Sequence, residues 1–273
     1  MDVIGTIEML DHPVDFAAIR VCPDGTNSTV HDAVQAENLL SVYVNDILTM
    51  QLGCSVTNLA ELVVGRMFTE GLISSADEVD CLSICEQSLR ADIYLSDRTA
   101  DLSRKAVQSV PTCCTMNRTV NEYFAQDDEL VAVKPLELDA EWVFRMTRVF
   151  LQDKTGHART RGVHSAYLST KNEMLCMRED IGRHNALDKV IGWALMNEVD
   201  LSRCMLFTSG RIPTDMAVKA IRSGIPILAT KTVATDKAVE LARNYCLTLI
   251  CEATPQSFDI LNDGMKRGWL SSS

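Results

Sequence analysis

The 273-residue sequence contains no uninterrupted run of the roughly 18 to 20 apolar residues that a membrane-spanning helix needs. Residues 1–16 carry neither a basic leader nor an apolar core, so we expect no secretory signal and a cytoplasmic location. The formal net charge is −11, which argues against a protein that binds nucleic acid or an anionic membrane over its whole surface. A local basic pocket is still compatible with that charge.

Several motifs of phosphate and metal chemistry are also missing. The chain has no G-x-x-x-x-G-K-[ST] loop and no G-x-G-x-x-G fingerprint. Its five histidines form no H-x-x-x-H, none is followed two residues later by glutamate, and its ten cysteines form no C-x-x-C. We therefore expect no bound structural metal. In a reducing cytoplasm, most of the cysteines should be small buried apolar side chains.

Patterning along the chain predicts three parts. Residues 1–110 contain short alternating segments around one helical segment, which favours a small α+β domain. Residues 111–138 belong to a polar stretch of little periodicity, which we interpret as a loop or linker. Residues 139–273 begin with a helical segment and then alternate strand and helix, which predicts an α/β domain with a mostly parallel sheet.

Local signals predict where several elements end. Asn45-Asp46 is expected to turn one strand back into the next. The helical pattern of residues 58–68 has Thr57 as a plausible cap and Gly71 as a stop, and Asn185 is expected to cap a helix over residues 185–198.

Polar residues and cations cluster where the predicted strands of the α/β domain end. Ligands of open α/β sheets bind beyond the carboxyl ends of strands, where helix N-termini favour anions. Turn and cap chemistry with surface cations would produce similar loops. Three such loops in an acidic protein nevertheless predict a pocket for a phosphorylated ligand. The candidate residues are Gly182, Arg183, His184 and Asn185; Thr208, Ser209, Gly210 and Arg211; Thr230, Lys231 and Thr232; and, after the last strand, Glu252, Ala253, Thr254, Pro255, Gln256 and Ser257.

The segment PTCCTMN, residues 111–117, places Cys113 beside Cys114. A disulfide between neighbours is strained and is opposed by a reducing cytoplasm, and two cysteines cannot complete a tetrahedral metal site. Arg104, Lys105 and Arg118 lie nearby in the sequence and would favour a thiolate. The pair is either a reactive carrier of sulfur or acyl groups, or two incidental thiols.

Longer stretches resemble a known family. EDIGRHNALDKVIG, residues 179–192, closely resembles the signature of the formate dehydrogenase accessory sulfurtransferases, the FdhD family. RGVHSAYL (161–168), which contains His164, resembles the family's Thr-Gly-Gly-x-His stretch, and residues 209–230 resemble its Ser-Gly-Arg helix and following strand. Residues 44–73 resemble its first-domain helix and preceding strands. The resemblance covers roughly residues 40–250.

Membership would imply a cytidine-deaminase-like three-layer C-terminal domain, a smaller N-terminal domain and a homodimer. It would also imply transfer of sulfur from a cysteine desulfurase to the molybdenum bis(guanine dinucleotide) cofactor of formate dehydrogenase. Cys113 then corresponds to the persulfide-bearing cysteine, and Cys114 becomes a possible auxiliary thiol. The polar and cationic loops at the strand ends, together with His164, would hold the guanine nucleotide halves of the cofactor.

Two motifs depart from the family pattern. The reactive loop of the family carries Cys-Gly-x-Cys, whereas here Cys114 replaces the glycine and Met116 replaces the second cysteine. The Phe-x-Arg-Gly-type loop corresponds to residues 252–257, which lack both the aromatic residue and the arginine. Two other hypotheses therefore stay open: a non-catalytic guanine-nucleotide or molybdenum-cofactor chaperone, and a deaminase-like hydrolase, against which the missing H-x-E and P-C-x-x-C elements argue.

Overall fold

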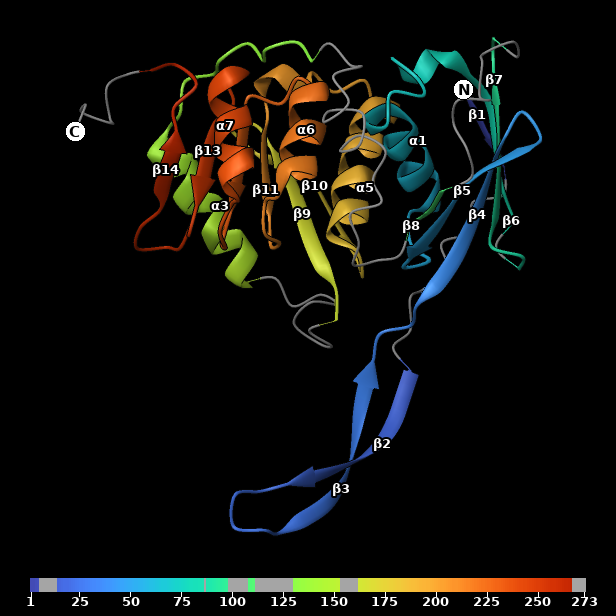
Figure 1. Ribbon diagram of the computed structural model, residues 1–273, viewed down its shortest axis with the longest axis vertical. Helices are drawn as coiled ribbons and strands as arrows, with labels where there is room; N and C mark the ends of the chain where they lie inside the picture. The colour runs from blue at the N-terminus through green and yellow to red at the C-terminus, as the bar shows by residue number, and fades with distance from the viewer. Residues whose placement is uncertain (5–13, 86, 98–107, 111–129, 153–161, 267–273) are drawn as a thin grey trace.

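The computed structural model describes residues 1–4, 14–85, 87–97, 108–110, 130–152 and 162–266. Two six-stranded sheets lie side by side, and a two-stranded arm projects from the N-terminal one (Figure 1). Among the described residues, no helix combines the length and apolar character needed to cross a membrane.

The N-terminal sheet has the strand order β1-β6-β7-β4-β5-β8 and is covered by one helix, α1 (Figure 1). Asn45 and Asp46 both have positive φ, as a two-residue hairpin turn between β4 and β5 requires, so the predicted turn is confirmed. The elements are β1 (Asp2–Ile4), β4 (Asn38–Val44), β5 (Ile47–Cys54), α1 (Leu59–Thr69), the 3₁₀ turn η1 (Ala76–Glu78), β6 (Val79–Cys85), β7 (Arg90–Leu95) and β8 (Gln108–Val110).

The expected cap of α1 was wrong by one residue. Asn58, with φ of 54°, directly precedes the helix, and its side chain makes no capping hydrogen bond. An asparagine tolerates this left-handed conformation better than the β-branched Thr57 would. Gly71, with φ of 68°, follows the helix as predicted.

The C-terminal sheet has the order β10-β9-β11-β12-β13-β14. Strands β10, β11, β12 and β13 run in one direction, as in the predicted mostly parallel sheet, whereas β9 and β14 run the opposite way. Because β9 lies between β10 and β11 and runs the opposite way, only the β11–β12 and β12–β13 pairings are parallel. The elements are α3 (Ala140–Gln152), β9 (His164–Ser169), β10 (Met174–Asp180), α5 (Arg183–Met196), the 3₁₀ turn η2 (Leu201–Arg203), β11 (Met205–Thr208), α6 (Thr214–Arg222), β12 (Ile227–Thr230), α7 (Asp236–Asn244), β13 (Thr248–Cys251) and β14 (Asp259–Asn262).

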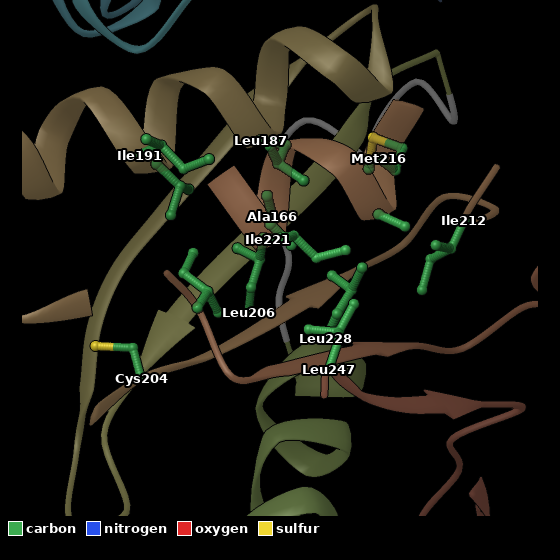
Figure 2. Packing of buried hydrophobic residues seen from close by; sticks show 14 of the residues in the cluster. Ala166, Leu187, Ile191, Cys204, Leu206, Ile212, Met216, Ile221, Leu228 and Leu247 are labelled. Atoms are coloured by element: carbon green, nitrogen blue, oxygen red, sulfur yellow. The ribbon is translucent and has the colours of Figure 1, made fainter. Parts of the chain in front are cut away.

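Alternating residues of these strands supply two apolar layers, so the expected three-layer α/β architecture is confirmed. One face, with Leu206 and Leu228, packs under α5, α6 and α7; in Figure 2 Leu187 and Ile191 of α5 point into this core. The opposite face, with Phe207, packs against α3. Val133 and Leu138 pack with these same cores, so the end of the predicted 111–138 linker lies on the C-terminal sheet.

Helices α1 and α5 cross at two glycines. A Cβ on Gly65 would lie 1.8 Å from the backbone oxygen of Asp188, and one on Gly192 would lie 1.9 Å from that of Glu61. Only glycine permits this separation, since real Cβ atoms do not approach a backbone oxygen so closely. The close crossing joins the two sheets.

A buried charge cluster lies beside this crossing. Lys219 of α6 places its Nζ 2.8 Å from both carboxylate oxygens of Asp188, and Arg66 of α1 lies 3.4 Å from the same carboxylate. Glu70 pairs with Arg66 at 3.1 Å, and the hydroxyl of Thr69 donates to Asp188 at 2.8 Å. Such charges are tolerated in a dry interior only when they are mutually compensated.

Candidate functional site: the carboxyl edge of the C-terminal sheet

Strand direction gathers the candidate residues at one edge of the C-terminal sheet. The carboxyl ends of β10, β11, β12 and β13 share this edge with the start of β9, because β9 runs the opposite way. His164 opens β9 and therefore lies with the loops that follow the other strands. The predicted convergence of these loops follows directly from this topology.

The first loop ends in the N-terminus of α5. Gly182 occupies the N-cap position with extended φ and ψ, and Arg183 and His184 form the first turn. A Cβ on Gly210 would lie 3.1 Å from the Cβ of Arg183 and 3.5 Å from the Nδ1 of His164. Gly210 thus lets the second loop lie directly against Arg183 and His164.

Arg183 carries an unused hydrogen-bond donor at this place. Its side chain is half-buried, and its Nε is shielded from solvent and has no hydrogen-bond partner among the described residues. A buried donor without a partner is costly unless a ligand or water meets it. At a helix N-terminus, where the backbone N–H groups also favour anions, an anionic ligand would satisfy it.

His184 is held by a residue that the sequence pattern did not identify. Its Nε2 lies 2.5 Å from Oδ2 of Asp215, in the first turn of α6, and both side chains are buried. Burial lowers the pKa of His184, although Asp215 partly opposes this shift. Burial alone would raise the pKa of Asp215, but His184, Lys219 and Arg183 outweigh it and lower that pKa to about 2.

Asp215 therefore stays ionised and ties the start of α6 to the start of α5. An acidic residue in the first turn of a helix is common because of the helix dipole. The local sequence thus gave no reason to assign Asp215 to the site.

Ser209 links β11 to β9. Its Oγ accepts a hydrogen bond from the backbone N–H of Ser165 at 2.9 Å and lies 3.5 Å from Nδ1 of His164. Its own N–H donates to the carbonyl of Ser165 at 2.9 Å. Ser209 therefore fixes the second loop next to His164, while the neighbouring Arg211 is exposed.

The third loop supports the second. The hydroxyl of Thr230 donates to the carbonyl of Gly210 at 2.6 Å, and the backbone N–H of Thr232 donates to Thr230 Oγ1 at 3.0 Å. The ammonium of Lys231 lies 4.6 Å from the ring centroid of Phe150, on α3. Thr230 and Thr232 thus position the loops, and Lys231 packs on the layer formed by α3.

Residues 252–257 lie beside the third loop. The N–H of Glu252 donates to the carbonyl of Thr232 at 2.7 Å, and that of Ala253 to the carbonyl of Thr230 at 3.0 Å. From Thr254 to Ser257 the segment closes on itself: the N–H of Thr254 donates to the Ser257 carbonyl at 2.8 Å, and the Thr254 hydroxyl accepts from the N–H groups of Gln256 and Ser257. Pro255 lies inside this turn. The loop lies at the edge as predicted, and its sequence contains no lysine or arginine.

The predicted cap role of Asn185 was wrong. Its side-chain nitrogen donates to the carbonyl of Gly53 at 2.7 Å and to Asp180 Oδ1 at 2.9 Å, which leaves Gly182 as the N-cap. Lys189 Nζ lies 2.7 Å from the other carboxylate oxygen of Asp180. The signature stretch therefore divides: Gly182, Arg183 and His184 form the start of α5 at the candidate site, whereas Asn185, Asp188 and Lys189 bind the two sheets together.

Cys113 and Cys114 lie outside the described residues. Among the cysteines that are described, Cys251 ends β13 at the same edge. Burial raises its pKa to about 11, so this thiol stays protonated at neutral pH and is a poor nucleophile.

The sequence of the chain matches a known protein family over most of its length. The sequence profile of the FdhD/NarQ family matches residues 35–267, which contain every loop of the site. The chain belongs to the FdhD/NarQ family. The sulfur carrier protein FdhD of Listeria monocytogenes serotype 4b is 31% identical over 243 residues, which cover 87% of this chain and 92% of that protein. The sulfur carrier protein FdhD of Bacillus subtilis strain 168 is 30% identical over 241 residues, covering 86% and 90%.

A solved structure has the same fold. It comes from Desulfotalea psychrophila and is described as that of a formate dehydrogenase accessory protein. The two structures superpose with a TM-score of 0.74 at 22% identity, covering 92% of this chain and 97% of the other. At this identity the match supports the α/β fold and the two-part architecture.

Proposed function

We propose that this protein carries sulfur as a persulfide on Cys113, from a cysteine desulfurase to the molybdenum bis(guanine dinucleotide) cofactor destined for formate dehydrogenase. Membership of a family whose relatives are named sulfur carriers supports the sulfur chemistry. The structural observation that carries the proposal is the buried Nε of Arg183, which has no hydrogen-bond partner in the described part of the chain and lies where the first and second loops meet. The cofactor is the substrate that receives the sulfur.

The residues of the edge fit a nucleotide phosphate better than a neutral ligand. Arg183 offers a guanidinium that can bind phosphate through two parallel hydrogen bonds, at the N-terminus of α5. Gly210 lets the second loop pack against Arg183 and His164, and His164 adds a ring nitrogen beside Ser209. Arg211, which is exposed, would meet a second phosphate from the solvent side.

The sulfur step balances without a metal on this protein. The Cys113 thiolate attacks the terminal sulfur of the desulfurase persulfide, an S–S bond forms on Cys113, and the old S–S bond breaks to release the desulfurase thiolate. Release of the carried sulfur as sulfide requires two electrons. An external thiol supplies them by forming a mixed disulfide with Cys113, which avoids the strain of a disulfide between neighbours.

Mass spectrometry tests the carrier role. After incubation with a cysteine desulfurase and cysteine, the wild-type chain should gain the mass of one sulfur atom, and a reducing agent should remove it. Cys114→Ser should keep the adduct and Cys113→Ser should lose it. An adduct that survives Cys113→Ser and disappears in Cys114→Ser would reassign the carrier.

A cofactor chaperone without sulfur chemistry is the second candidate, since Met116 replaces the second cysteine of the family's reactive loop and residues 252–257 lack the aromatic residue and arginine of its C-terminal loop. Calorimetric titration with GDP separates the two when it is read with the adduct measurement. Arg183→Ala should weaken GDP binding at least about tenfold, because a charge-assisted phosphate contact is lost. Arg203→Ala, an exposed arginine that precedes β11 at the opposite edge, serves as the control. GDP binding without a persulfide would favour the chaperone.

A further inference from the structure

A buried histidine–aspartate pair joins the starts of helices α5 and α6 beside the candidate anion site. His184, in the first turn of α5, places its Nε2 2.5 Å from Oδ2 of Asp215, in the first turn of α6. Only 7% of His184 and 1% of Asp215 are exposed. Within the described chain the His184 ring pairs with no other side chain, so its second nitrogen, Nδ1, is left without a partner there.

Arg183 brings the charge of a bound ligand close to this pair. It directly precedes His184 in the first turn of α5, and its buried Nε has no partner among the described residues. Burial is the main cause that lowers the pKa of His184, and the positive charges of Arg183 and Lys219 add to it. An anion bound to Arg183 offsets one of these charges and brings a negative charge of its own. Both effects favour a protonated His184.

Other charged groups packed near the pair are balanced inside the fold. Helices α1, α5 and α6 contribute the buried cluster of Arg66, Glu70, Asp188 and Lys219. Strand β10 contributes Asp180, whose carboxylate lies 2.7 Å from the ammonium of Lys189. Strand β9 contributes His164, whose Nδ1 lies 3.5 Å from Oγ of Ser209. Asp215 is therefore the counter-charge of His184, and the remaining variable charge is that of a ligand at Arg183.

We propose that the His184–Asp215 pair couples anion binding at Arg183 to the uptake of a proton from solvent by His184. Without a ligand, His184 is neutral and Asp215 is ionised. With a ligand, the added negative charge favours the imidazolium, and Asp215 supplies the counter-charge that a buried cation needs. Because proton and anion then favour each other's binding, the site binds its anion more tightly as the pH falls.

The coupling makes His184 a residue that selects ligands by their charge. The electrostatic gain from the imidazolium grows with the charge of the ligand, so a doubly charged phosphate gains more than a singly charged anion. Asp215 acts through His184 and is a positioning residue. The inference rests on the anion site of the proposed function, but neither on Cys113 nor on sulfur transfer.

Sulfate is the probe that tests the coupling, because it does not titrate near neutral pH and every proton taken up then belongs to the protein. The chain has five histidines, so nuclear magnetic resonance can follow their labelled rings individually and assign them with single His→Gln variants. Saturating sulfate should raise the titration midpoint of His184 in the wild type by about one pH unit or more. A midpoint that stays in place while sulfate binds would overturn the proposal.

Exposed His31 provides the reference in the same spectra. It lies on the two-stranded arm formed by β2 (Val14–Val21) and β3 (Asn27–Val34), which extends away from both larger sheets (Figure 1). Its midpoint should not respond to sulfate. Because both midpoints are measured on the wild-type chain, the comparison holds even if a variant at His184 fails to fold.

The pH dependence of sulfate affinity gives a second measurement. Between about pH 7.5 and pH 6 the wild-type affinity should rise at least about threefold. His184→Gln should abolish the rise, because the titrating ring is gone, and Asp215→Asn should remove most of it, because the counter-charge is gone. His31→Gln should keep both the affinity and the rise. His164→Gln should keep the rise, and methyl sulfate, with one negative charge, should show a smaller one.

The outcomes separate this inference from the proposed function. Sulfate binding that needs Arg183 but has the same affinity at both pH values would overturn the proton coupling and leave the anion site intact. A rise that survives in His184→Gln would overturn it equally. A wild-type chain that binds neither sulfate nor GDP would overturn both the coupling and the cofactor site, whereas the persulfide on Cys113 is read separately by mass spectrometry.

Discussion

At the scale of single residues, His184 and Asp215 control each other's protonation through a contact of 2.5 Å. Burial keeps His184 neutral in the folded protein, so the unfolded chain binds a proton more readily and stability falls as the pH drops through about 6.5. Asp215 has a folded pKa of about 2, so its contribution is complete above roughly pH 4 and is lost as the pH falls towards 2. Both groups therefore make the fold sensitive to acid.

The Asp215→Asn variant isolates the lower part of this dependence. The lowered pKa corresponds to roughly 2 kcal/mol of stability at neutral pH. The loss of unfolding free energy between about pH 4 and pH 2 should shrink by that amount in Asp215→Asn, measured by urea denaturation. Asp236→Asn, an exposed position in the first turn of α7, is the matched control. An unchanged slope in Asp215→Asn would show that the pKa of Asp215 is the same in the folded and unfolded chains.

At the scale of elements, the crossing of α1 and α5 depends on the absence of a Cβ. Gly65→Ala would place a methyl group 1.8 Å from the backbone oxygen of Asp188, which cannot move without shifting α5. We expect a loss of about 3 kcal/mol or more in the free energy of unfolding, since overpacking against backbone relaxes poorly. Glu240→Ala on the exposed side of α7 should change it by less than about 0.5 kcal/mol. A neutral Gly65→Ala would mean that the helices lie further apart.

The elements that the sequence predicted well are those with strong periodicity. The turn at Asn45-Asp46 and the strand–helix alternation after residue 162 follow from local pattern, and so does the gathering of loops at one edge. Strands β3 and β10 were not predicted, because NSTVHDAV and MLCMRED contain few apolar residues in regular alternation. Likewise, the buried role of Asp188 depends on Lys219 and Arg66, which are distant in sequence, so no local pattern could reveal it.

At the scale of the whole molecule, the charge cluster around Asp188 couples the two sheets. Asp188→Asn would leave Lys219 and Arg66 without their shared carboxylate in a dry interior, and should cost about 3 to 5 kcal/mol in denaturant unfolding. Lys237→Ala, which breaks an exposed pair with Glu240, should cost less than about 1 kcal/mol. Equal effects of the two substitutions would contradict a structural role for the cluster.

Delivery of labelled sulfur tests the central claim most directly. The chain would be loaded with radiolabelled sulfur by a cysteine desulfurase, separated from it, and mixed with the molybdenum bis(guanine dinucleotide) cofactor, a thiol reductant and formate dehydrogenase lacking its cofactor. We predict that the wild type passes its label to the enzyme-bound cofactor, that Cys113→Ser carries no label, and that Arg183→Ala is loaded normally but delivers slowly. Label that reaches the cofactor equally well from Cys113→Ser would contradict the account.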